Sequence, residues 1–160
     1  ENENSELKPP MVIGVVGDNP FEKAFEPLLD KKIKDRDLKI VLIPGLGDSL
    51  KKAPDRSQAV ERYFKDNEPT LRACHVLFYC NSEKDYLAVH LRKVKETSVL
   101  TVGDIENFIE WNGIISFVKE NNKIRFEIHL NQAEKQHLKI SSQLLKLARR
   151  VIQEKESNDS

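Results

Sequence analysis

The segment TSVLTVGDIENF, residues 97–108, decides the fold together with three segments that follow it: GIISFV (113–118), KIRFEIHLN (123–131) and LKISSQLLKLAR (138–149). Residues 99–102 predict a strand, and Asp104 is a good N-cap for a helix behind it. The second and third segments predict two strands, which the turn Glu120-Asn-Asn-Lys123 joins into a β-hairpin. Strand, helix and hairpin therefore follow one another in the C-terminal half.

Two further helices are expected after the hairpin. The sequence from Asn131 to Glu134 fits a capping box for the first helix, and Ser141 or Ser142 would cap the second. The last helix would present one apolar face, made of Leu144, Leu145, Leu147, Ala148 and Val151.

Three apolar segments upstream predict buried strands: residues 11–16 (MVIGVV), 39–43 (KIVLI) and 74–80 (CHVLFYC). Helices are expected over residues 20–30, 57–65 and 85–95, with a loop over 45–56. Strands that alternate with helices favour a mainly parallel sheet. We therefore predict an α/β fold, a three-layer sandwich with a mainly parallel sheet, helices on both faces and a C-terminal antiparallel hairpin.

The chain of 160 residues has the length of a single domain, which we place at residues 11–152. Residues 1–10 are polar and are expected to form a flexible lead-in, and residues 153–160 a disordered tail. No run of apolar residues approaches the roughly 20 that a membrane helix needs, so this segment is not expected to insert into a membrane. A signal peptide is not expected within this sequence.

The charge balance argues against nucleic-acid binding. The 26 Lys and Arg residues equal the 26 Asp and Glu residues in number, so the formal net charge is zero. A nucleic-acid-binding domain usually carries a basic face that supplies much of its affinity.

The sequence lacks the patterns of a catalytic or metal site. Cys74 and Cys80 lie about 20 Å apart along one predicted strand, whereas a disulfide needs Cα atoms within about 7 Å, so we expect no bond between them. The four histidines show no zinc-ligand spacing, and no Gly-x-Ser-x-Gly motif is present. We expect no catalytic residues, no metal and no cofactor.

Two sets of residues are candidates for binding. Ligands of open parallel sheets bind beyond the carboxyl ends of the strands. Four polar residues follow predicted strands there and form the candidate ligand site: Asp18, Asn19, Ser82 and Asp104. The alternative interpretation of these residues is structural capping.

The second candidate is a basic surface on the last two helices. Lys135, Lys139 and Arg149 would contact an acidic partner or simply solvate that face. Arg125 and Glu127 share one face of a strand and are expected to form an ion pair with a neighbouring element.

Six segments in order resemble the YfiR/HmsC family of bacterial periplasmic regulators over residues 11–152. These are VIGVVGDNPF (12–21), CHVLF (74–78) and the four C-terminal segments quoted above. The resemblance implies a non-enzymatic, periplasmic sensor or repressor. Such a domain would bind a membrane-bound diguanylate cyclase of cyclic di-GMP signalling, and homodimers are common in the family. The alternative is a small-molecule-binding input domain of a sensor histidine kinase.

The chain departs from the family pattern in three places. The helix that usually precedes the first strand is not matched, and the segment from 44 to 70 is longer than usual. Cysteine pairs of some members are missing, with Glu110 and Phe117 in the neighbouring positions. A stabilising disulfide is therefore not expected.

Overall fold

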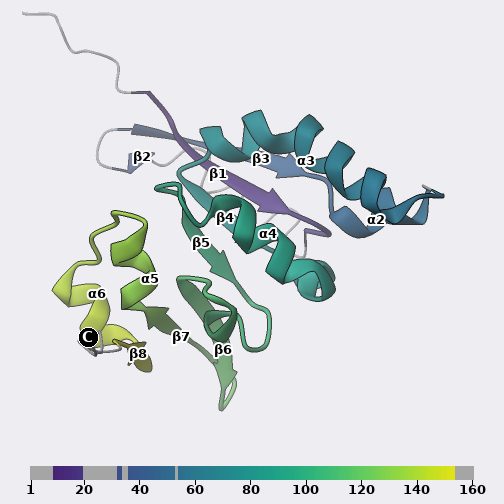
Figure 1. Ribbon diagram of the computed structural model, residues 1–160. Coiled ribbons are helices and arrows are strands. Elements are labelled where there is room, and N and C mark those ends of the chain that lie inside the picture. The colour runs from purple at the N-terminus through teal and green to yellow at the C-terminus, as the bar shows by residue number, and fades with distance from the viewer. Residues whose placement is uncertain (1–8, 20–31, 34–35, 53, 154–160) are drawn as a thin grey trace, which may run out of the picture.

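The computed structural model describes residues 9–19, 32–33, 36–52 and 54–153 (Figure 1). Within these residues eight strands form one mixed sheet in the order β2-β3-β1-β4-β5-β6-β7-β8. Their bounds are β1 Met11–Val16, β2 Lys32–Ile33, β3 Arg36–Ile43, β4 Val76–Tyr79, β5 Leu100–Gly103, β6 Ile115–Glu120, β7 Lys123–His129 and β8 Arg150–Ile152. The pairs β2–β3 and β6–β7 are antiparallel and the other neighbours are parallel, which confirms the predicted mainly parallel sheet.

Helices lie in most of the connections between the described strands. They are α2 Leu46–Lys51, α3 Arg56–Ala73, the 3₁₀ helix η2 Asn81–Tyr86, α4 Leu87–Val94, the 3₁₀ helix η3 Ile109–Trp111, α5 Leu130–Lys135 and α6 Ser142–Leu147. The helix expected over residues 20–30 lies outside the described residues.

Two apolar clusters lie on opposite faces of the sheet, because neighbouring residues of a strand point to opposite sides. On β1, Val16 belongs to the cluster that also holds Tyr63 of α3 and Leu91 of α4. Its neighbour Val15 belongs to the other cluster, against which Leu144 of α6 packs. Figure 1 shows α3 and α4 along one side of the sheet and α5 and α6 beside β7 and β8. The three-layer arrangement is therefore confirmed in the described part of the chain.

The hairpin turns at the predicted residues, 120–123. Phe117 lies opposite Phe126 and Glu120 opposite Lys123. Asn121 and Asn122 turn the chain with positive φ angles of 50° and 63°, a conformation that asparagine adopts more readily than most residues.

The segment from 45 to 73 contains more helix than the sequence predicts. The expected loop holds α2, and α3 continues to Ala73 rather than ending near Lys65. Pro69 lies inside α3, where it removes one backbone donor. Burial of Phe64 and Leu71 on one side of the helix favours its continuation past the proline.

The prediction of a helix after Asp104 is wrong, since only the three-residue η3 forms there. Asn107 and Asn112 have φ angles of 64° and 75°, which no α-helix accommodates. Phe108 is fully buried against Gly103, where an added Cβ would lie 2.7 Å from its ring. The chain therefore turns around this ring before it enters β6.

The C-terminal helices also differ from their predictions. His129 rather than Asn131 caps α5, because its Nδ1 accepts a 3.1 Å hydrogen bond from Gln132 N. Ser141 caps α6 as predicted. The prediction that the apolar face of the last helix reaches Val151 is wrong, since α6 ends at Leu147. Val151 lies in β8, opposite Ile128 of β7.

Candidate functional site

The carboxyl ends of β1 and β4 meet at the centre of the sheet. β1 has β3 on one side and β4 on the other, so the connections leave in opposite directions at this point. Open α/β sheets bind ligands at such a position. The residues that follow these two strands therefore form the candidate site.

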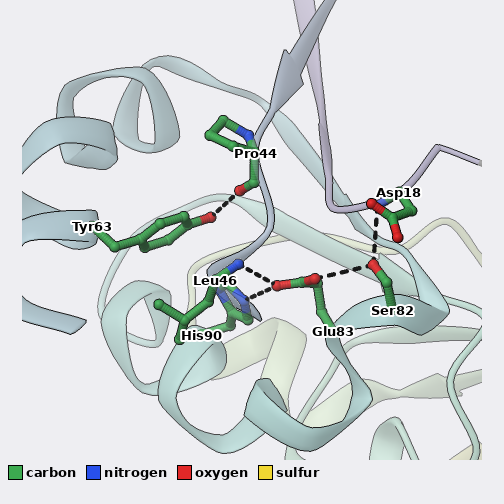
Figure 2. Close-up of polar contacts among 7 residues, drawn as sticks. All are labelled: Asp18, Pro44, Leu46, Tyr63, Ser82, Glu83 and His90. Carbon is green, nitrogen blue, oxygen red and sulfur yellow. Dashed lines mark hydrogen bonds and ion pairs between the residues drawn. The ribbon is translucent and has the colours of Figure 1, made fainter. Parts of the chain in front are cut away.

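The structure brings Asp18 and Ser82 together there, as Figure 2 shows. The Asp18 backbone N–H donates a 3.0 Å hydrogen bond to Ser82 Oγ. Ser82 Oγ in turn donates to Glu83 Oε2 at 3.0 Å. Gly17 turns the chain with a φ of 104°, and an added Cβ would lie 2.5 Å from Ser82 Oγ. The Ser82 hydroxyl therefore links the two strand ends within the protein.

Glu83 is the residue at the centre of this arrangement, and the sequence interpretation missed it. Its side chain is almost completely buried. Oε1 accepts hydrogen bonds from Leu46 N at 2.7 Å and from His90 Nε2 at 3.0 Å (Figure 2). Glu83 lies in the 3₁₀ helix η2 and His90 in α4, so no single helical repeat in the sequence connected the two residues.

The Glu83 carboxylate is held in its charged form. Burial alone would raise its pKa, but the hydrogen bonds from His90, Leu46 N and Ser82 outweigh burial and hold the pKa below its ordinary value. Gly45 leaves room for the carboxylate, because a Cβ at this position would overlap Glu83 Oε2.

Three aromatic rings enclose His90. The ring centroids of Tyr63, Phe64 and Tyr79 lie 5.9, 5.7 and 5.3 Å from that of the imidazole. Tyr63 Oη also donates to Pro44 O at 2.5 Å. Since Glu83 and His90 are both screened from solvent, this acid–base pair fixes the loops after β1, β3 and β4 rather than presenting a reactive group.

The remaining candidate ligand residues lie around this centre. Asn19 is half-buried, and the helix that it was expected to cap lies outside the described residues. Asp104 is exposed at the end of β5, where partial desolvation raises its pKa. It lines a hollow of about 430 Å³ together with Asn81, Ser116 and Arg150. Asp18 and Ser82 thus come together, while Asp104 faces a separate hollow. Ligand binding by these residues stays a prediction.

Both cysteines are free and buried, which confirms that they do not pair. Burial raises the pKa of the Cys74 thiol. Burial, followed by the nearby carboxylates of Asp104, Glu83 and Asp18, raises the pKa of Cys80 to about 12. A thiol is a poor nucleophile when its thiolate is disfavoured.

Arg149, one of the three predicted partner-binding residues, is engaged within the protein. Its Nε lies 3.0 Å from Glu120 Oε2 and 3.9 Å from Glu127 Oε2. Arg150 joins Glu127 to Glu110 at 3.1 and 2.8 Å. The ion pair expected between Glu127 and a neighbouring element is therefore made with Arg149, directly before β8, and with Arg150, the first residue of β8.

The other two predicted partner-binding residues, Lys135 and Lys139, are exposed. Lys135 lies in the last turn of α5 and borders a groove of about 640 Å³ between α4, η3 and α5. Lys139 lies between α5 and α6. Among the described residues neither lysine has a carboxylate within ion-pair distance.

Within the described residues no group of three or more histidine, cysteine or acidic side chains is arranged to hold a metal ion. No helix of that part of the chain is both long and apolar enough to span a bilayer.

Together these features define an α/β domain with a mostly parallel sheet and a closed polar centre at its strand ends. A family model described as YfiR/HmsC-like (DUF4154) matches residues 2–149. The chain therefore belongs to the YfiR/HmsC-like family, as the sequence predicted.

The fold is also similar to a solved structure, described as the crystal structure of a conserved domain protein from Vibrio cholerae O1 biovar El Tor. The TM-score is 0.59, and the match covers 89% of this chain. This chain spans only 55% of the length of the Vibrio cholerae protein chain. Because the identity is 12%, the likeness concerns the fold alone. No curated protein is significantly similar to the chain.

Proposed function

We propose that this domain regulates a membrane-bound signalling enzyme by protein contact in the periplasm, with a diguanylate cyclase as the expected partner. The observation that carries the proposal is the family match over residues 2–149. The family regulates cyclic di-GMP signalling and is generally regulatory rather than catalytic.

Two structural features support a non-enzymatic role. The acid–base pair Glu83–His90 is enclosed by aromatic side chains and has no access to a substrate. Both thiols are buried with raised pKa values, so neither is activated for attack. Neither the acid–base pair nor the two thiols are therefore placed for catalysis.

Co-expression tests this proposal. The chain is exported to the periplasm of a host that makes no cyclic di-GMP of its own, together with one membrane-bound diguanylate cyclase of the source organism at a time. The concentration of cyclic di-GMP is measured by mass spectrometry. We expect the exported domain to lower it for at least one cyclase that has a periplasmic segment. An unchanged concentration for every such cyclase, with the domain folded in the periplasm, would contradict the proposal.

We further propose a second candidate function, small-molecule input for a sensor kinase, because all four polar candidates follow the carboxyl ends of strands. Asp18 meets Ser82 there, Asn19 follows, and Asp104 faces the 430 Å³ hollow. Thermal unfolding with panels of nucleotides and amino acids tests it. A ligand should raise the unfolding midpoint of the wild type but not of Asp104→Asn. If no compound in the panels shifts the midpoint, this candidate is overturned.

A further inference from the structure

The groove between α4, η3 and α5 combines an exposed aromatic ring with unpaired positive charge. Three cations border it, Arg92, Lys95 and Lys135, against one carboxylate, Glu96. Trp111 contributes its ring and is 55% exposed. We propose that this groove binds an acidic segment of a protein partner, in which carboxylates flank an apolar side chain. The inference rests on the proposed regulatory function for the kind of partner involved.

The cations of the groove are available for a partner. No carboxylate of the described residues lies within ion-pair distance of Arg92, Lys95 or Lys135, whereas Arg149 and Arg150 are engaged with glutamates. Lys93, their neighbour on α4, points elsewhere and lies 5.2 Å from the Phe64 ring. Since the whole chain is neutral, the excess of two positive charges is a local property of the groove.

The Trp111 ring gives the groove an apolar contact. Indole rings are frequent anchors in protein interfaces because they bury a large area at little entropic cost. An indole ring and cations that line the same groove favour an occupant that combines an apolar side chain with carboxylates.

The walls of the groove are fixed in advance of binding. Gln136, directly after α5, is buried, and its Nε2 donates to Val94 O, Thr97 O and Val99 O at 3.3, 3.1 and 3.0 Å. These bonds hold α5 against the end of α4 and the start of β5. A groove that needs little ordering loses less free energy on binding.

The shape of the groove favours a protein segment over a small molecule. Small-molecule pockets usually enclose most of the ligand surface. Here Arg92, Lys95, Lys135 and Trp111 are all exposed, so the groove is an open trough. An extended or helical segment of a partner can lie along such a trough.

Selection from a yeast-displayed library of random dodecapeptides, with the full chain as bait, tests the inference. We expect the enriched peptides to be acidic with a central apolar residue. Trp111→Ala and the double variant Arg92→Glu, Lys135→Glu should each weaken binding of an enriched peptide at least about tenfold in fluorescence anisotropy. Peptides of neutral or basic composition, or no enrichment, would overturn it.

Two matched controls separate the groove from general effects. Ile124→Ala removes another exposed apolar side chain, and Lys146→Glu reverses an exposed charge on α6; both should bind within about twofold of the wild type. Unfolding midpoints confirm that every variant is folded. If Trp111→Ala instead converts a dimer to a monomer in light scattering, the occupant is a second copy and the proposal is wrong.

The cyclase assay distinguishes this inference from the proposed function. If the groove variants regulate the cyclase as strongly as the wild type does, the proposed binding role of the groove is wrong and the proposed function stands. If the protein binds acidic peptides but regulates no cyclase, the proposed function is wrong and the proposed binding role of the groove is supported.

Discussion

His90 donates a 3.0 Å hydrogen bond to Glu83 in a position where both residues are at most 2% exposed. The same carboxylate accepts from the backbone of Leu46 and from Ser82. One buried acid therefore joins α4 to the loops that follow β1 and β3. A carboxylate so placed is costly to bury alone, and its hydrogen bonds offset that cost.

Removal of this carboxylate should destabilise the fold. Glu83→Ala leaves the Leu46 N–H and the imidazole without their acceptor, and we expect the free energy of unfolding to fall by about 3–5 kcal/mol. Urea unfolding followed by circular dichroism measures the change. Glu134→Ala, an exposed glutamate in α5, serves as the control and should change it by no more than about 0.5 kcal/mol. Equal effects of the two substitutions would show that the buried bonds contribute little.

The depressed pKa of Glu83 predicts a specific acid sensitivity. In the unfolded chain the carboxyl titrates near its usual value of about 4.3, and in the folded protein it titrates lower. Its stabilising contribution is therefore complete above the unfolded pKa and is lost as pH falls through the folded pKa.

Unfolding free energies measured between pH 3 and pH 7 for the wild type and Glu83→Gln should show this difference. The wild type should lose more stability below about pH 4.3 than the variant does. Glu110, whose pKa is lowered by Arg150, titrates in both proteins and cancels in the comparison. Parallel acid curves for the two proteins would refute the assignment.

Backbone geometry at the end of β1 gives a third prediction. Gly17 has a φ of 104°, and a Cβ there would press on Ser82 and Glu83. Gly17→Ala should lower the free energy of unfolding by about 1–3 kcal/mol. Gly47→Ala is the comparison, because its Cβ would lie 3.3 Å from the Tyr86 ring, which a small shift relieves. If the two alanine variants are equally stable by urea unfolding, the strand ends are less closely packed than the structure indicates.

The features that sequence patterns predicted are those that local chemistry decides. Apolar runs define β1 at Met11–Val16, and two asparagines define the turn of the hairpin. Ser141 caps α6 through a bond to a residue three positions away. Each of these elements depends on residues that are close in the sequence.

The features that were missed depend on distant partners. β8 exists because Arg149 N donates to Phe126 O and the chain then pairs with β7. The importance of Glu83 becomes visible only when Leu46, 37 positions earlier, supplies a donor. Of the candidate site, Asp18 and Ser82 were correctly placed at one sheet end, but the buried acid between the strand ends was not predicted.

Thiol reactivity provides a fourth prediction. Both cysteines are buried, and the Cys80 pKa is raised to about 12, so little thiolate exists at neutral pH. Ellman's reagent at pH 8 should label the native protein at least about a hundredfold more slowly than the urea-unfolded protein. Cys74→Ala and Cys80→Ala assign the two phases. Rapid labelling of the native chain at either position would mean that the strand ends open to solvent.

The groove at Trp111 should depend on a residue that never touches the partner. Gln136→Leu removes the donor to Val94, Thr97 and Val99, and it leaves Gln132 Nε2 without its 2.9 Å acceptor. Unpaired buried polar groups cost about 1–3 kcal/mol each, so the unfolding free energy should fall by at least that amount. Because α5 then loses its attachment to the end of α4, affinity for an enriched acidic peptide should fall as well, in the folded fraction of the protein. Gln143→Leu, at an exposed position of α6, should alter neither property. Unchanged affinity in a destabilised Gln136→Leu would show that the groove walls hold their position without this side chain.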